Sequence, residues 1–232
     1  MENGQSNIIN LTKEQTYHKK LMVSILKSLL NTPLVLKGGT ALFLAYGLNR
    51  FSEDLDFDSS KKLNLLNKIK TSAPFDIKIE NINVKKNTDT VTRYIVNYFV
   101  PKIEKQNRLK IEISYRTPAP KESVIIRDGI QFASIERLID NKLSVAYDGE
   151  YTRAKGRDLF DLHFLAKYYS NHFDAKNCER FKKFVLANKT AETYLEDFKQ
   201  DKLLKFVDFD KLVEELNMLA EQINNKKSKA RR

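Results

Sequence analysis

The chain has 232 residues, 41% of them apolar, with a formal net charge of +11 and a pI of about 9.5. This length is enough for one domain, or two small ones, with a proper hydrophobic core. No apolar run approaches about 18 residues, the N-terminus does not resemble a secretory signal, and Cys178 has no second cysteine, so we expect a cytoplasmic protein without membrane spans, disulfides or a zinc site.

The first third of the chain predicts a helix, a short strand, a second helix and a pair of aspartates. Apolar residues at helical spacing predict a helix over 11–31, and Leu34-Val35-Leu36 suits a buried strand. Gly38-Gly39 follow, and a helix is expected from Thr40 to Gly47. After a link over 48–53 comes Asp54-Leu55-Asp56-Phe57. On an extended strand Asp54 and Asp56 point to the same face.

The middle of the chain predicts several strands without helices between them. A helix is expected over 61–72, and alternating apolar residues predict strands over 75–84, 92–101 and 109–116, separated by polar turns over 85–90 and 102–107. Such neighbours in sequence favour antiparallel pairing. The segment 124–132 reads as a short strand or an extended link.

From Ser134 onward the pattern is helical, over 134–148, 155–170, 177–187, 190–200 and 208–225. We therefore expect an α/β domain over 1–132, a helical domain over 133–225 and a basic, disordered tail over 226–232. Five positive charges lie in that tail, and the remainder of the chain carries the other +6. The excess suits a nucleic acid or another polyanion, although a general bias toward lysine also explains it.

The Gly-Gly turn and the aspartate pair together suggest nucleotide chemistry. Backbone N–H groups at a glycine turn and a helix N-terminus bind phosphate. Two adjacent carboxylates favour a cation, and Mg²⁺ binds through one or two carboxylates plus substrate phosphates. The alternative is a surface strand with a solvated acidic end, because an Asp-x-Asp pair by itself is weak evidence for a metal site.

These residues resemble a known family. Gly38-Gly39-Thr40 followed by Arg50-Phe51-Ser52-x-Asp54-x-Asp56-Phe57 is similar to the AbiEii family of nucleotidyltransferase-like toxins, which belong to bacterial abortive-infection and type IV toxin–antitoxin systems. The likeness continues through 109–116 and 133–166. It implies a polymerase-β-like fold with a mixed sheet, followed by an all-helical half. The 14 residues between Gly39 and Asp54 are slightly long for the pattern.

Glu112 is the candidate third carboxylate. In 109–115 the apolar residues alternate onto one face, and Lys110, Glu112 and Ser114 take the other. The resemblance implies an acid on a strand beside the aspartate pair that binds metal or accepts the proton of an attacking hydroxyl. A Lys110–Glu112 pair on a half-exposed strand is the structural alternative.

Lys142 falls inside the apolar stripe of the helix expected over 134–148. A lysine there must either snorkel to solvent or meet an anion. The resemblance implies that it pairs with nucleotide phosphates, close to Asp54, Asp56 and Asp158.

The string Arg157-Asp158-Leu159-Phe160-Asp161-Leu162 opens the next helix. Asp158 suits a helix N-terminus, and Arg157 and Asp161 are spaced for a simple helical pair. By resemblance, Asp158 orients Lys142 or the nucleotide, Arg157 contacts the nucleotide and Asp161 supports the helices. Further nucleotide contacts are expected from Lys37, Gly38, Gly39, Thr40 and Ser52.

The expected activity is transfer of a nucleotide from an NTP, with Mg²⁺ (or Mn²⁺) held by Asp54 and Asp56. By resemblance, the acceptor is RNA, such as tRNA, or a protein hydroxyl, and a cognate antitoxin is the expected partner. The alternatives are a nucleotide-binding or partner-binding protein with little catalysis and a kinase-like phosphotransferase. Products distinguish them, because nucleotidyl transfer releases pyrophosphate and a kinase releases nucleoside diphosphate.

Overall fold

The computed structural model describes residues 9–147, 155–186 and 190–229, which divide into two compact units. Among the described residues, the sheet unit comprises 9–134, and the helical unit comprises 135–147, 155–186 and 190–229. In the described ranges, no helix combines the length and the apolar character that a membrane crossing needs.

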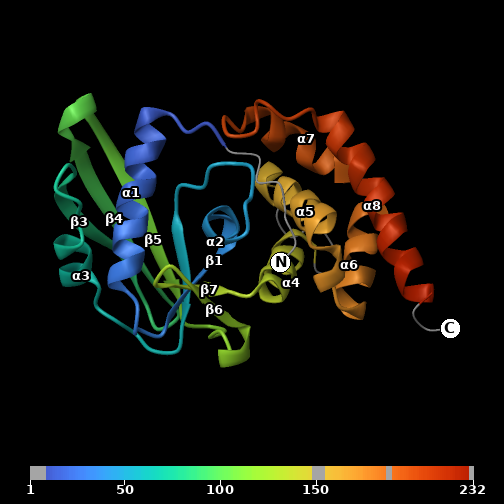
Figure 1. Cartoon of the computed structure of the whole chain (residues 1–232), viewed down its shortest axis with the longest axis horizontal. Helices are drawn as coiled ribbons and strands as arrows, with labels where there is room; N and C mark the ends of the chain where they lie inside the picture. Colours follow the sequence, from blue (N-terminus) through green and yellow to red (C-terminus); the bar gives the residue numbers. More distant parts are fainter. Residues whose placement is uncertain (1–8, 148–154, 187–189, 230–232) are drawn as a thin grey trace. The chain divides into compact units, whose positions relative to one another are not determined.

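The sheet unit is a mixed sheet with helices packed on it (Figure 1). Its described strands run in the order β3-β4-β5-β2-β1-β7-β6. The pairs β1–β7 and β2–β5 are parallel, and the other neighbours are antiparallel. The elements are α1 (Lys13–Ser28), β1 (Leu34–Lys37), α2 (Gly38–Ala45), β2 (Leu55–Ser59), α3 (Leu66–Thr71), β3 (Lys78–Asn87), β4 (Val91–Val100), β5 (Lys105–Ser114), β6 (Val124–Arg127) and β7 (Ile130–Ala133), with 3-10 turns at Pro101–Ile103 and Lys121–Ser123.

The helix α1 begins at a capping box and packs on the sheet. The Thr12 hydroxyl accepts from the Gln15 N–H at 3.1 Å, and the Gln15 side chain accepts from the Thr12 N–H at 3.0 Å. One face of α1, with Leu21, Met22 and Ile25, is fully buried. The β4 and β5 residues on the opposite side of this core are equally buried, so α1 and the sheet share one apolar layer.

The predicted mixed α/β architecture with a helical second half is confirmed, and several predicted boundaries were wrong. The helix α2 begins at Gly38 rather than Thr40 and ends at Ala45. The expected helix over 61–72 shortens to Leu66–Thr71. Two strands extend into the predicted polar turns: β3 continues to Asn87, and β5 begins at Lys105. Both pair with β4 over these segments, and this pairing outweighs their polar composition. The segment 124–132 forms a hairpin, β6–β7, that turns at Asp128 and Gly129 with positive φ.

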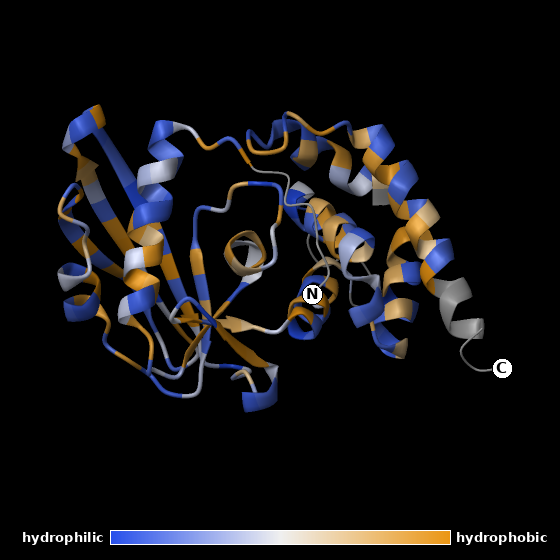
Figure 2. Ribbon diagram, in the orientation of Figure 1, coloured by the Kyte–Doolittle hydropathy of each residue, from blue (hydrophilic) through white to orange (hydrophobic). Residues whose placement is uncertain are grey.

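The helical unit contains α4 (Ile135–Ala146), α5 (Gly156–Tyr168), α6 (Ala175–Leu186), α7 (Thr190–Gln200) and α8 (Phe209–Lys229), with a 3-10 turn at Ser170–His172. Each helix carries both apolar and polar residues along its length (Figure 2). The apolar residues face inward, and α8 packs against α5 and α6. The helix α8 extends to Lys229, so the first part of the expected tail is helical; residues 230–232 lie outside the described residues.

The start of α5 lies against α7. A Cβ added to Gly156 would lie 2.6 Å from the Phe198 Cα and 3.0 Å from the Phe198 backbone nitrogen, so only glycine fits there. The Asp197 carboxylate accepts from the Gly156 N–H at 2.7 Å and pairs with Lys155. The α7 carboxylate therefore caps α5 from another helix, and the missing side chain at Gly156 lets the two backbones approach.

We expect Gly156→Ala to destabilise the protein by about 1–3 kcal/mol, because the added methyl group must displace a backbone. Denaturant unfolding followed by circular dichroism measures this change. Lys199→Ala, at an exposed position of α7, serves as the control and should leave the midpoint nearly unchanged. An unaltered midpoint for Gly156→Ala would contradict the close approach of α5 and α7.

Candidate active site

The first turn of α2 presents backbone without side chains beside Asp56. Gly38 has φ of +73°, and a Cβ there would lie 3.5 Å from the Asp56 Oδ2. A Cβ on Gly39 would lie 2.6 Å from the Arg50 Nη2 and 3.0 Å from the Ser52 Oγ. The N-cap residue Lys37 makes no side-chain cap. The first N–H groups of α2 are thus available to an anion, as expected of a phosphate-binding helix start.

Two side chains hold the backbone of the loop over 50–54 that leads to the aspartates. The Thr40 hydroxyl, on α2, bonds to the Asp54 carbonyl and lies 2.8 Å from the Ser52 hydroxyl. His18, on α1, donates from Nε2 to the Glu53 carbonyl at 2.8 Å. Its Nδ1 then accepts from the Tyr98 hydroxyl at 2.7 Å. Burial lowers the pKa of His18, which keeps the ring neutral and suits this pair of bonds.

Charged residues form one row across four strands of the sheet. Asp56 on β2 is the partner of Lys37 on β1 and of Glu112 on β5, and Glu112 in turn is the partner of Arg93 on β4. Residues directly opposite each other in a sheet share a face, so these four side chains project together. The structure therefore brings Asp56 and the predicted third carboxylate Glu112 side by side on adjacent strands.

Most of these charged side chains form ion pairs. Lys110 pairs with Asp54 at 2.7 Å, and the Arg93 guanidinium pairs with Glu112 at 2.6 Å. The structural alternative, a Lys110–Glu112 pair, is not what the structure shows, because Lys110 pairs with Asp54 and Glu112 pairs with Arg93. Burial opposes the charged form of Lys110, but the hydrogen bond to Asp54 and the nearby carboxylates raise its pKa.

Lys37 is paired as well, with the buried Asp58 at 2.5 Å. A lysine expected to bind nucleotide thus neutralises a third aspartate on the same face of β2. Asp54 and Asp56 remain as the acids nearest to the start of α2, and Ser52 is buried beside them through its contact with Thr40.

Asp56 differs from its neighbours, because within the described residues its carboxylate has no hydrogen bond or ion pair. Burial raises the pKa of Asp56; Lys110 acts against this, and Asp54 and Glu112 add to it. A divalent cation would relieve this repulsion, and carboxylate oxygens are ligands that Mg²⁺ prefers. No group of three or more potential ligands is assembled in the described part of the chain. The pair Asp54 and Asp56 would therefore hold a Mg²⁺ ion with its remaining ligands supplied by nucleotide phosphates and water.

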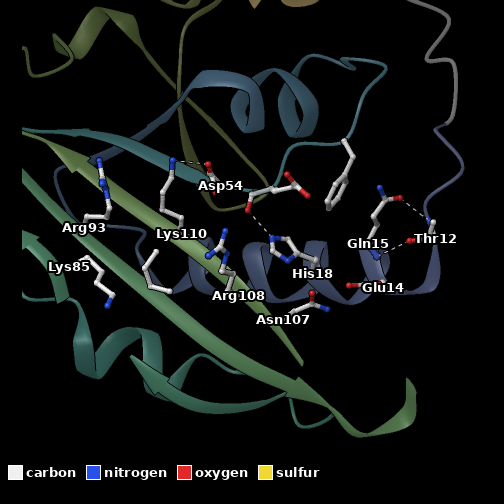
Figure 3. Close-up of a pocket in the computed structure, with 13 residues that line it drawn as sticks. Thr12, Glu14, Gln15, His18, Asp54, Lys85, Arg93, Asn107, Arg108 and Lys110 are labelled. Atoms are coloured by element: carbon white, nitrogen blue, oxygen red, sulfur yellow. Dashed lines mark hydrogen bonds and ion pairs between the residues drawn. The ribbon is translucent and has the colours of Figure 1, made fainter. Parts of the chain in front are cut away.

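A cavity of about 910 Å³ opens next to Asp54 (Figure 3). Its lining comes from the start of α1, the loop before β2, and the strands β3, β4 and β5. Asp54 and Lys110 lie on one side of it, joined by their ion pair, and His18 lies on α1 at its wall.

Lys142, in the helical unit, is buried between two aspartates. Its Nζ lies 2.8 Å from Asp158 and 2.5 Å from Asp161, and its side chain is 10% exposed. The snorkelling alternative was wrong, because partners on α5 compensate the charge inside the unit. The predicted contact with Asp158 is confirmed. Proximity of Lys142 to Asp54 and Asp56, which belong to the sheet unit, stays a prediction.

Arg157 pairs with Asp201 at 2.5 Å. The predicted ion pair between Arg157 and Asp161 was therefore wrong. Asp161 instead pairs with Lys142 in the interior, and Arg157 lies at the end of α7. This leaves Arg157 38% exposed and close to a carboxylate.

Sequence reasoning did not identify His18, Asp58 or Arg93 as neighbours of this site, and it placed Lys110 on the face of Glu112 without identifying Asp54 as its partner. For Asp58 a signal was present, because the alternation of Asp54 and Asp56 continues to it. The roles of His18 and Arg93 depend on the packing of α1 and on strand register, which a single sequence does not determine.

We expect Lys142→Met to destabilise the protein by about 3–5 kcal/mol, because it leaves two buried carboxylates without their shared cation. Thermal and denaturant unfolding test this. The control is Lys183→Met, which removes an exposed ion pair with Glu179 in the same unit and should have little effect. Equal stability of the wild type and Lys142→Met would contradict a structural role for the buried cluster.

Comparisons with known proteins identify the family of the chain. The family model described as nucleotidyl transferase AbiEii toxin, type IV TA system, matches residues 20–228. A crystal structure of a candidate nucleotidyltransferase from H. pylori is 47% identical with a TM-score of 0.90, covering 95% of this chain and 99% of that one. The crystal structure of JHP933 from Helicobacter pylori is 47% identical with a TM-score of 0.91, covering 95% of this chain and 96% of that one.

A search of proteins with curated descriptions found no significant match. The match of the family model over most of the chain, and the similarity of two solved structures over nearly all of it, confirm the predicted family and the predicted enzyme class, nucleotidyltransferase. The chain belongs to the AbiEii family of nucleotidyltransferase toxins of type IV toxin–antitoxin systems.

Proposed function

We propose that this nucleotidyltransferase transfers a nucleotide from an NTP to a hydroxyl group of an RNA or protein acceptor, in a Mg²⁺-dependent reaction. The observation that carries the proposal is the Asp56 carboxylate, which has no partner among the described residues and lies beside Glu112 and the start of α2. The family description supports a cognate antitoxin as the protein's partner in the cell.

Each part of the sheet unit has a place in this reaction. The N–H groups at Gly38 and Gly39 would bind triphosphate oxygens, and Asp54 and Asp56 would hold the Mg²⁺. When bound, Mg²⁺ neutralises charge on the phosphates as the bond to the leaving group breaks. Thr40 and His18 hold the backbone of the loop before β2, so that both carboxylates keep their positions.

The chemical step exchanges one bond to phosphorus for another. The acceptor oxygen bonds to the α-phosphorus, the bond from that phosphorus to the bridging oxygen breaks, and pyrophosphate leaves. Glu112 accepts the proton of the attacking hydroxyl, and the Arg93 guanidinium, 2.6 Å away, holds the Glu112 carboxylate in place. For Lys142, Asp158 and Arg157, contact with the nucleotide stays part of the proposal.

Binding of Mg²⁺ with a non-hydrolysable NTP analogue should raise the melting temperature of the wild type and not that of Asp56→Asn. Without ligand, Asp56→Asn should be as stable as the wild type or more stable at neutral pH, because burial disfavours the ionised carboxylate. Asp89→Asn, at an exposed position of the β3–β4 turn, is the control and should respond as the wild type does. An equal rise in the melting temperature of Asp56→Asn would contradict the assignment of Asp56 as a metal ligand.

Incubation of the protein with each α-labelled NTP, Mg²⁺ and total bacterial RNA tests the transfer itself. The expected result is pyrophosphate release with label on a macromolecule, abolished in Asp56→Ala. Nucleoside diphosphate as the product would indicate a kinase-like reaction, and no product with any NTP would favour a binding protein. Each of these two outcomes would overturn the proposal.

A further inference from the structure

In the described part of the chain, one edge of β5 has no partner strand next to the candidate active site. The strand β4 pairs with β5 along Lys105–Ser114, whereas β2 pairs with it only along 111–114. Residues 105–110 of β5 therefore extend past the start of β2, beside the loop that carries Glu53 and Asp54. The cavity of about 910 Å³ lies at this edge (Figure 3). We call it the β5-edge groove.

Basic side chains from three strands line the β5-edge groove. Arg108 and Lys110 come from β5, Arg93 from β4 and Lys85 from β3. Lys85 is the extra residue of a bulge in the β3–β4 pair. Arg93 and Lys110 are ion-paired with acids of the active site, but Lys85 and Arg108 make no side-chain hydrogen bond or ion pair to any part of the chain that the structure describes.

An amide in the same groove also lacks a partner. The Asn107 Nδ2 is buried and has no hydrogen-bond acceptor within the described residues. Leaving a buried donor unsatisfied costs about 1–3 kcal/mol, so such a group favours a ligand that offers an oxygen. Lys85, Arg108 and the Asn107 amide thus have no partner among the described residues, and all three lie on the β3–β5 side of Asp54. A ligand with several anionic oxygens would pair with all of them.

The reaction geometry places the acceptor on this side. In phosphoryl transfer the attacking and leaving oxygens lie roughly in line on opposite sides of the phosphorus. The start of α2, which would hold the leaving pyrophosphate, adjoins Asp56 from the β1 side. Glu112, the proposed proton acceptor, adjoins Asp56 from the β5 side. The attacking hydroxyl therefore approaches across β5, where the groove lies.

We propose that the β5-edge groove binds a single-stranded RNA acceptor, with Lys85 and Arg108 on its phosphates and Asn107 donating to one of its oxygens. This rests on the proposed nucleotidyl transfer. A protein acceptor would offer no regular series of anions to the unpaired cations. Glu14 and Glu53 also line the groove, on the α1 and loop side, and direct the strand toward the basic β3–β5 side.

The test measures binding of a fluorescently labelled single-stranded RNA of about 12 nucleotides by anisotropy, in EDTA and without NTP. Lys85→Ala/Arg108→Ala should bind roughly tenfold more weakly than the wild type at moderate salt. Its slope of log K against log salt should be smaller by about 1.4, since each lost phosphate contact removes about 0.7. The matched control is Lys70→Ala/Lys121→Ala, which removes two exposed charges of the same unit outside the groove and should leave both values unchanged.

Asn107→Leu tests the amide separately, because it removes a neutral donor and keeps much of the shape. It should weaken RNA binding without changing the salt slope, and thermal stability should hold or rise because the unsatisfied donor is gone. Unchanged binding and slope in the double variant would overturn the proposal, as would equal losses in the double variant and its control.

The design also distinguishes this inference from the proposed function. Because binding is measured without NTP or metal, RNA binding that depends on the groove in a protein that transfers no nucleotide would refute the transfer alone. Conversely, labelling of a protein acceptor by the double variant at the wild-type rate, with RNA binding unaffected, would refute the groove as the acceptor site and leave nucleotidyl transfer intact.

Discussion

Within the residues that the structure describes, the Asp56 carboxylate has no hydrogen-bond or ion-pair partner, and the charges around it are arranged to accommodate it. Burial and the charges of Asp54 and Glu112 disfavour its ionised form. The neighbouring acids are each neutralised by a base, Lys110 for Asp54 and Arg93 for Glu112. The result is one site of uncompensated negative charge next to the bare N–H groups of α2. A bound cation would compensate the carboxylate charge, and the nucleotide phosphates bound with it would accept from the N–H groups of α2.

The helical unit contains a buried positive charge, and in this case the charge is compensated. Lys142 lies within the apolar side of α4, and Asp158 and Asp161 from α5 surround its ammonium group. A buried cluster of this kind is costly to break, since removal of the lysine leaves two carboxylates in a medium of low polarity. The close approach of α5 to α7 at Gly156, with the Asp197 cap, fixes the beginning of the same helix. The position of Asp158 is therefore set by backbone packing as well as by charge.

Much of this structure was predictable from the sequence, and the failures have physical causes. The period of two over Asp54 and Asp56, and over Lys110 and Glu112, was sufficient to predict strands with charged faces. The sequence also predicted a helix after the first strand, but placed its start at Thr40 instead of Gly38. The ends of β3 and β5 were mispredicted, because ladder pairing with β4 outweighs local polarity. The partners of Lys110, Glu112 and Arg157 depend on register and on packing between helices, which distant parts of the chain determine.

The most direct test of the central claim is crystallography of the protein with Mn²⁺ and a non-hydrolysable NTP analogue, using the anomalous signal of the metal. The account predicts a Mn²⁺ peak between the carboxylates of Asp54 and Asp56, with the triphosphate at the N–H groups of Gly38 and Gly39 and the Lys110 ammonium displaced from Asp54. A bound nucleotide without metal at these aspartates, or with its phosphates away from the start of α2, would contradict it.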